Sequence, residues 1–243
     1  MIDVYGVTVH WVPMLSEQVW PGPGMTTFPA EHMADTEWMA ARVADTGRRW
    51  RSTDRRVNGT LWWYSASSTV TGIPVATALV TGFAANPRLT DAKAFLRSDG
   101  YLGGLTTASF IPADEDLSQL ADVLTSTLTD LIAALSEASG VRPRALWAIV
   151  TDSVANRALD AGDACGDRAI GSDFAHRLVD GMRRAGAPMP QPRFVDVERD
   201  GRTKCFTQRA SCCLIYEARE NKCVSCPKRL PSERIADLRK LVF

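Results

Sequence analysis

Apolar residues recur at helical intervals through the middle of the chain. Between Asp114 and Ser139, leucines stand three or four residues apart, which predicts a long amphipathic helix. Acidic residues begin this segment and Gly140 follows it, as helix-dipole and C-cap preferences favour. The same periodicity predicts a helix after Pro143, another from Gly171 to Arg184, and one over residues 31–46.

Two further segments depart from this pattern. Residues 57–87 contain no charge but are rich in Ser, Thr, Gly and Asn, so we expect one or two buried helices meeting near Gly72-Ile73-Pro74. A stable membrane span is not expected, because a spanning helix needs about 20 mainly apolar residues. Peripheral membrane contact stays open. The first 30 residues, rich in Pro, Gly, Met and Trp, predict a loop or packed arm with little regular structure.

Short strands are expected in two places. Residues 93–97 and 101–111 flank Ser98-Asp99-Gly100, which is typical of a hairpin turn. After the proline-rich linker at 187–192, the segment RFVDVE alternates apolar and charged residues, and Thr203 to Gln208 can return beside it. The predicted fold class is therefore α+β. A mainly helical body with a few short strands spans residues 1–190, and a small hairpin and loop element spans residues 191–243.

Charge is unevenly distributed along a chain whose formal net charge is zero. Residues 199–243 hold eleven Lys and Arg against five Asp and Glu, a net charge of +6. Five arginines also stand within residues 48–56. Each of these two basic segments could bind an acidic partner or form a solvated, salt-bridged surface. The first residues lack the basic and apolar regions of a signal peptide, so we expect a cytoplasmic protein.

Four of the six cysteines, Cys212, Cys213, Cys223 and Cys226, form a C-C-x9-C-x2-C pattern. Disulfides are disfavoured in a reducing compartment. A four-cysteine zinc site remains open, but neighbouring residues of an extended chain point in opposite directions, so an adjacent pair suits one small ion poorly. An iron–sulfur cluster is larger and also takes four thiolates. The spacing favours the cluster without excluding zinc.

The motif resembles the C-terminal [2Fe–2S] signature of the FhuF-like ferric-siderophore reductases. The resemblance rests on Arg209-x-x-Cys212-Cys213-Leu214-x-Tyr216 followed by Cys223-x-x-Cys226-Pro227. More loosely, Arg144 to Trp147 and the following helix resemble the family's helical part. The interval between the two cysteine pairs is one residue shorter than in the family pattern. Val224 and Ser225 also stand where the family commonly has a glycine, which affects the expected exposure of the cluster.

This resemblance implies an iron–sulfur oxidoreductase with a [2Fe–2S] cofactor on the four cysteines. It would transfer one electron to a ferric siderophore of the hydroxamate class and release Fe(II). No catalytic group is expected beyond the cluster. Residues 1–190 would dock the siderophore. Because we find no nucleotide or flavin motif, an external donor such as a ferredoxin or flavin reductase is implied.

Several residues are candidates for roles around the cluster. Arg209, Tyr216, Lys222 and Lys228 are candidate second-layer residues, and Trp62 and Trp63 are candidate substrate contacts, although burial in the core would also explain two large aromatics. The rival function is a four-cysteine zinc or redox-sensing iron–sulfur protein that regulates or binds nucleic acid. The neutral net charge and lack of a helix-turn-helix pattern speak against nucleic acid as a partner.

Overall fold

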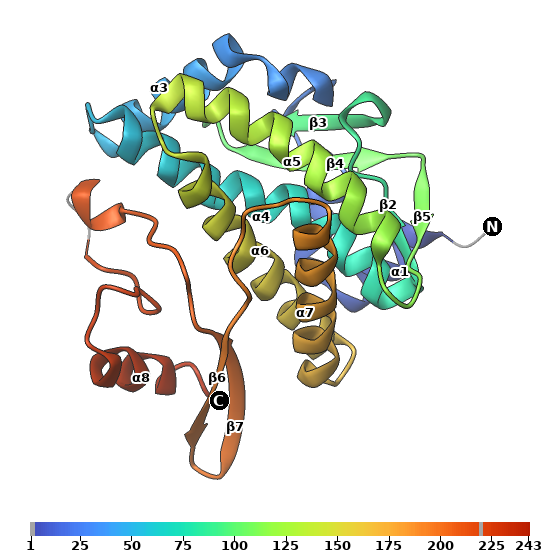
Figure 1. The fold of residues 1–243 in the computed structure, drawn as a ribbon, viewed down its shortest axis with the longest axis vertical. Coiled ribbons are helices and arrows are strands. Elements are labelled where there is room, and N and C mark those ends of the chain that lie inside the picture. Colours follow the sequence, from blue (N-terminus) through green and yellow to red (C-terminus); the bar gives the residue numbers. More distant parts are fainter. Residues whose placement is uncertain (1–2, 219–220) are drawn as a thin grey trace.

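The computed structural model describes residues 3–218 and 221–243 and has the predicted mainly helical α+β architecture (Figure 1). Its long helices are α3 (Thr36–Trp50), α4 (Arg55–Thr81), α5 (Ser118–Ser139), α6 (Pro143–Ala164) and α7 (Arg168–Arg184). The helices predicted after Pro143 and up to Arg184 are confirmed. The helix expected over residues 31–46 begins later, because Asp35 accepts hydrogen bonds from the backbone N–H groups of Glu37 and Trp38 and so caps α3.

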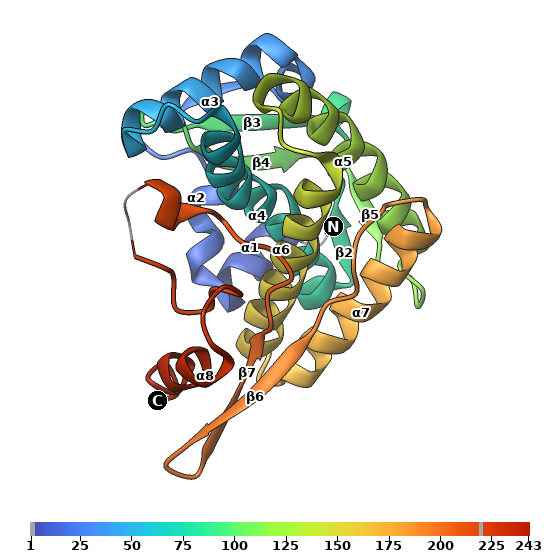
Figure 2. The ribbon, with the colours of Figure 1, turned by 60° about the vertical axis from the view of Figure 1, so that its left-hand side comes forward.

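Helix α4 forms the centre of the body. It runs without interruption through Pro74, so the segment folds as one helix rather than two. Threonine hydroxyls along it donate to carbonyls one turn earlier, as in Thr71 to Ser67 and Thr77 to Ile73, which lets polar side chains sit in a buried helix. Helices α3, α5 and α6 pack against α4 and bury most of its length (Figure 2).

The prediction for the first 30 residues was wrong. They contain α1 (Val4–Trp11), the 3-10 turn η1 (Pro13–Leu15), α2 (Ser16–Val19) and strand β1 (Thr26–Pro29). Apolar side chains of this region, including Val12, Leu15 and Val19, pack with Ile73 and Ala76 of α4. The composition of this segment does not predict regular structure. Packing against α4 therefore stabilises its helices and strand.

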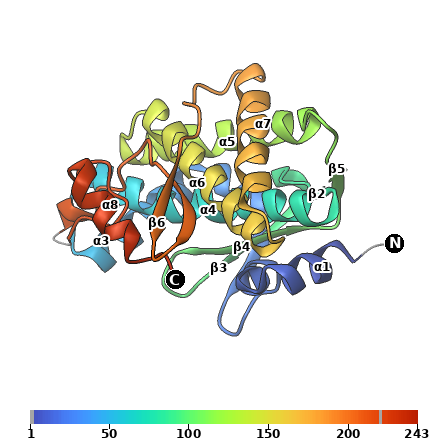
Figure 3. The same ribbon diagram turned by 90° about the horizontal axis from the view of Figure 1, so that it is seen from below.

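The strands form small sheets at one side of the helices. Antiparallel β1, β3 (Ala92–Leu96) and β4 (Leu102–Thr107) make a three-stranded sheet, which confirms the hairpin around Ser98-Asp99-Gly100. This sheet lies between α4 and the N-terminal helices (Figure 3). Strands β2 (Phe83–Ala85) and β5 (Phe110–Pro112) pair separately, and the 3-10 turns η2 (Ala30–Ala34) and η3 (Leu89–Asp91) complete this side.

The C-terminal segment extends beyond the helical body and then returns to it. The predicted hairpin is present as β6 (Phe194–Arg199) and β7 (Arg202–Thr207), which project away from the helices (Figures 1 and 2). The chain then passes along α4, forms the turn η4 (Ile215–Ala218) and ends in α8 (Pro231–Arg239), an element that the sequence pattern did not predict. The division into residues 1–190 and 191–243 stays a prediction.

The long uncharged segment forms most of α4. Among the described residues, no helix combines the length and apolar character needed to cross a membrane.

Candidate iron–sulfur site

The cysteine segment lies against the first half of α4. Cys213 and Ala218 are buried together with Val57 and Leu61 of that helix, and half-buried Leu214 packs against the same cluster. The segment is therefore held to the helical body by apolar contacts as well as by the covalent connection through β7. Its position relative to α4 and α6 sets the surroundings of the thiols.

Asp152 of α6 fastens the residues that precede the adjacent cysteines. Its Oδ1 accepts a hydrogen bond from the backbone N–H of Ala210 at 2.8 Å, and its Oδ2 accepts from the N–H of Ser211 at 3.0 Å and from the Ser211 hydroxyl. The Asp152 side chain is only 2% exposed. Burial raises the pKa of Asp152, while these hydrogen bonds and Arg209 oppose that rise. One carboxylate thus fixes the backbone that leads into Cys212.

Arg209 is a buried positive charge beside the thiols. Its side chain is 4% exposed, its Nε lies 3.8 Å from Oδ2 of Asp152, and its guanidinium carbon lies 4.2 Å from the centre of the Tyr64 ring. Its Nη1 donates a hydrogen bond to Sγ of Cys223 at 3.0 Å. The sequence analysis proposed Arg209 as a second-layer residue, and the structure places it in direct contact with a cysteine.

The four thiols lie as two pairs, each joining the C-C motif to the C-x2-C motif. Sγ of Cys212 lies 3.9 Å from Sγ of Cys226, and Cys213 and Cys223 belong to the same apolar cluster against α4. Two thiolates bound to one tetrahedral ion at about 2.3 Å stand about 3.8 Å apart. The pair of Cys212 and Cys226 therefore has the spacing suited to one metal ion, and Cys213 with Cys223 would supply the other two thiolates of a centre with two.

The protonation of the second pair favours metal binding. The hydrogen bond from Cys223 lowers the pKa of Cys213 to about 5, and the Arg209 charge acts in the same direction. The same hydrogen bond, with burial, raises the pKa of Cys223. The thiolate is the form that binds metal, so the lowered pKa of Cys213 would favour a metal centre at this pair. Binding of a metal would release the thiol protons.

The backbone adopts an uncommon conformation directly after the adjacent cysteines. Leu214, directly after them, has φ +61°, a left-handed conformation that is uncommon for a branched residue. Such a conformation costs about 1 to 3 kcal/mol, which packing of Leu214 and Ile215 against α4 helps to offset. The turn at Leu214 redirects the chain directly after the two cysteines and leads it into η4.

Unsatisfied donors next to the thiols indicate an anionic group between them. Nε and Nη2 of Arg209 are buried and have no hydrogen-bond partner within the described residues. Buried charged donors normally have acceptors, and the sulfides and thiolates of an iron–sulfur cluster would provide them. In the described parts of the chain, no three His, Cys, Asp or Glu side chains are grouped to hold a single metal ion. The donor set fits a cluster.

The other predicted second-layer residues lie at the edge of the site. The Lys228 ammonium contacts the hydroxyl of Tyr216, and Lys222 donates to the carbonyl of Lys228 at 3.1 Å. None of the three contacts a thiol as Arg209 does. Both lysines are exposed, so they carry charge at the rim.

The sequence analysis missed one residue that orders the second cysteine loop. Nε of Arg229 donates to the carbonyl of Cys223 at 2.9 Å, and its Nη1 lies 3.3 Å from Oδ2 of Asp237 in α8. Arg229 thereby connects α8 to the loop that carries Cys223 and Cys226. Its place three residues after the last cysteine was the only available sequence signal.

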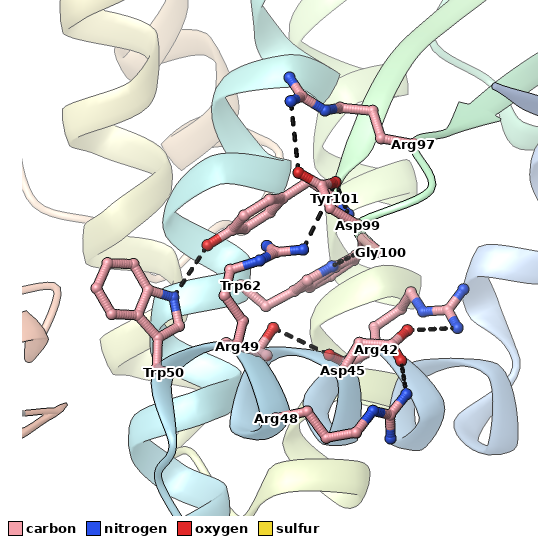
Figure 4. A network of polar contacts seen from close by, with 11 residues as sticks. Arg42, Asp45, Arg48, Arg49, Trp50, Trp62, Arg97, Asp99, Gly100 and Tyr101 are labelled. Carbon is pink, nitrogen blue, oxygen red and sulfur yellow. Dashed lines mark hydrogen bonds and ion pairs between the residues drawn. The ribbon is translucent and has the colours of Figure 1, made fainter. Parts of the chain in front are cut away.

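Trp62 and Trp63, the candidate substrate contacts, are buried in the core, as the alternative of core packing predicts. They are 1% and 0% exposed, and their Nε1 groups donate to the carbonyls of Gly100 and Leu146. Figure 4 shows Trp62 beneath the network that joins α3 to the β3–β4 turn, in which Arg49 pairs with Asp99 and lies over the Tyr101 ring. These tryptophans pack the core, and several of the neighbouring arginines are salt-bridged.

Replacing Trp62 with phenylalanine tests this structural role. The change removes the hydrogen bond to Gly100 and leaves space beside Trp38, so we expect a loss of about 1 to 3 kcal/mol in the free energy of unfolding. Cluster content and chelate affinity should stay at wild-type values. Denaturant unfolding measures the stability, and a binding titration of the cluster-loaded protein measures the chelate affinity. Weakened chelate binding by a fully folded variant would restore the substrate role.

Comparison with known protein families agrees with this geometry. The family model described as the FhuF 2Fe-2S C-terminal domain matches residues 209–228, which include Arg209 and all four cysteines of the site. A search of curated proteins found no match. The resemblance predicted from the motif is confirmed over these residues: the segment matches a C-terminal [2Fe–2S] domain of the FhuF type, which supports a [2Fe–2S] cluster at this site.

Proposed function

We propose that Cys212, Cys213, Cys223 and Cys226 bind the [2Fe–2S] cluster and that the protein is a ferric-siderophore reductase. The observation that carries the proposal is the pairing of each thiol of the C-C motif with one of the C-x2-C motif, beside the buried charge of Arg209. The family match to residues 209–228 supports the same conclusion.

The reaction is a one-electron reduction of Fe(III) to Fe(II) in the bound siderophore. Hydroxamate oxygens are hard, anionic ligands that bind Fe(III) more tightly than Fe(II), so reduction makes the iron exchangeable without hydrolysis of the chelator. The cluster supplies one electron when it is bound. The substrate class we propose is a hydroxamate chelate.

The chain's own side chains divide the remaining tasks. Cys213 and Cys226 are buried, which limits the access of water to the inner side of the site, whereas Cys212 and Cys223 are half-buried and reach the surface. Arg209 provides positive charge where added negative charge must be stabilised. Asp152 holds Arg209 and the backbone of residues 210 and 211 in place.

The electron is proposed to come from an external donor, such as a ferredoxin or a flavin reductase. The +6 charge of residues 199–243 supports the docking of an acidic donor near the cluster. We place the reaction in the cytoplasm, where thiols remain reduced. Residues 1–190 would contribute the docking surface for the siderophore.

Replacing Arg209 with glutamine is expected to lower the reduction potential of the cluster by roughly 65 to 130 mV, because a charge-assisted hydrogen bond of about 1.5 to 3 kcal/mol corresponds to that range for one electron. Arg209→Lys should retain part of the effect. Exposed Lys222→Gln serves as the control and should shift the potential much less. A spectroelectrochemical titration measures the reduction potential of each variant. Equal potentials in wild type and Arg209→Gln would remove Arg209 from this role.

The function is tested by comparing two chelates of one hydroxamate siderophore. Anaerobically purified protein is reduced with dithionite, freed of excess reductant and mixed with the Fe(III) or Ga(III) complex. Only the Fe(III) complex should restore the visible absorption of the oxidised cluster, because Ga(III) accepts no electron under these conditions. A colourless protein that contains zinc and no sulfide, or a reduced protein that Fe(III) leaves unchanged, would overturn the proposal.

A further inference from the structure

A pocket of about 660 Å³ opens beside Cys212. Its walls come from the start of α4, the turn between α5 and α6, the first turns of α6, and residues 210–214. Cys212 is thus part of the wall, and its partner Cys226 lies 3.9 Å behind it, almost fully buried. Small-molecule sites commonly have volumes of about 300 to 1,000 Å³, so a metal chelate fits this one.

The wall of this pocket combines apolar surface with positive charge. Ile149 and Leu214 contribute apolar side chains, whereas Arg56 and Arg142 contribute guanidinium groups. Arg56 forms an ion pair with Glu217 at 2.9 Å, and Arg142 is exposed at the beginning of α6. The helix dipole adds positive potential at the same end of α6. The sequence analysis left open whether the arginines of residues 48–56 meet an anionic ligand, and Arg56 is placed to do so.

A second hollow of about 780 Å³ adjoins the first, because Ala148 lines both. Three arginines, Arg144, Arg183 and Arg184, and a single acidic residue, Asp180, contribute to its lining. Within residues 3–218 and 221–243, these three arginines and Arg142 form no ion pairs. No cysteine lines this larger hollow, so it can extend a site at Cys212 but cannot replace it.

We infer that the pocket beside Cys212 binds the ferric chelate and selects chelates that carry peripheral carboxylates. This inference rests on the proposed reductase function and deepens it by naming the site and the charge of its ligand. The chelate's iron core would lie against Cys212, and its carboxylates would meet Arg56 and Arg142, with the arginines of the second hollow beyond. Arginine binds carboxylates through two parallel hydrogen bonds, which gives both affinity and orientation.

Charge distinguishes this ligand from simpler hydroxamate chelates. Three monoanionic hydroxamates neutralise Fe(III), so a chelate with no other charged group offers no ion-pair partner to Arg142 or to the arginines of the second hollow. A chelate with free carboxylates is an anion and complements them. A neutral ligand in this pocket would remove water from the arginine side chains without offering them an anionic partner, which costs free energy.

The test measures binding to the oxidised holoprotein by calorimetry, with redox-inert Ga(III) complexes as probes. One probe is a citrate-derived dihydroxamate, which keeps carboxylates, and the other is a linear trihydroxamate without them. We expect the carboxylate-bearing probe to bind at least about tenfold more tightly at low salt, and added salt to reduce the difference. Arg142→Gln should abolish most of the preference, and Arg142→Lys should retain part of it.

Two further variants separate this inference from a general loss of structure. Arg177→Gln removes an arginine of α7 that lines neither hollow and should leave both affinities unchanged. Ala145→Trp places bulk in the pocket and should weaken both probes while the cluster spectrum stays intact. Equal affinity for the two probes, a preference that survives Arg142→Gln, or unchanged binding in Ala145→Trp would overturn the inference.

The outcomes also distinguish this inference from the proposed function. If the wild type reduces Fe(III) chelates but Ala145→Trp binds and reduces them equally well, the function stands and the pocket assignment fails. If the wild type reduces neither the carboxylate-bearing nor the carboxylate-free Fe(III) chelate, the proposed function fails and the pocket assignment fails with it.

Discussion

Replacing Asp152 with alanine is expected to leave most chains without a cluster, although Asp152 is not a cysteine and lies far from the motif in sequence. The change removes three hydrogen-bond acceptor contacts to residues 210 and 211 and leaves Arg209 as a buried charge without its ion-pair partner. Breaking a buried ion pair in this way costs about 3 to 5 kcal/mol. Iron and acid-labile sulfide per chain, together with visible absorption, measure the loss.

Asp160→Ala provides the matched control. Asp160 lies on the same helix and pairs with Arg157 at 2.7 Å, but it makes no contact with the cysteine segment. We expect this variant to hold a full complement of iron and sulfide. Asp152→Asn should lie between the two, because its amide oxygen can still accept one of the backbone hydrogen bonds. Wild-type cluster content in Asp152→Ala would contradict the anchoring role.

The largest effect is expected from replacing Cys226 with serine. Cys226 is 1% exposed and pairs with Cys212, so the change removes one ligand of a buried pair. Serine is a harder ligand and is poorly suited to a thiolate site. We expect iron and sulfide to be lost together, with the visible bands, and the same result for Cys213→Ser in the other pair.

Cys205→Ser is the control for cysteine chemistry. Cys205 lies in β7 opposite Asp196, and burial raises its pKa to about 11, so it is a poor candidate ligand. The variant should keep the cluster. A full cluster in Cys226→Ser, or its loss in Cys205→Ser, would show that the ligand set is assigned incorrectly.

The sequence predicted the parts of the fold that repeat a simple period. The leucines of α5, the stripe of α6 and the alternation in β6 each follow one helical or strand pattern, and the structure confirms these elements. The N-terminal residues were predicted wrongly because their order depends on packing against α4. No local pattern contains that tertiary contact.

The cysteine ligands of the site could be predicted from the sequence, but the residues that hold them in place could not. The cysteine spacing and its resemblance to a family signature pointed to Cys212, Cys213, Cys223 and Cys226, whereas Asp152 and Tyr64 gave no motif. One signal for Asp152 existed: it is the only charged residue among the buried positions of α6. Buried carboxylates are uncommon without a partner, so such a position indicates a paired charge elsewhere in the chain.

The tryptophans were open to two interpretations. Six of the seven lie in the first 63 residues, where they could line a pocket for a bulky chelate or pack the core. In the structure, Trp62 and Trp63 fill the core, and the pocket beside Cys212 is lined instead by arginines and small apolar side chains. Residue type alone does not separate a packing aromatic from a binding one, because both roles use the same large apolar surface.

The most direct test of the account counts electrons. Reduced protein, freed of excess reductant, is mixed anaerobically with excess ferric hydroxamate chelate and an Fe(II) trap, and the trapped Fe(II) is compared with the cluster content. We predict one Fe(II) per [2Fe–2S] cluster, formed as the oxidised spectrum returns, and none from Cys226→Ser. A wild-type protein with a full cluster that yields no Fe(II) would contradict the reductase assignment.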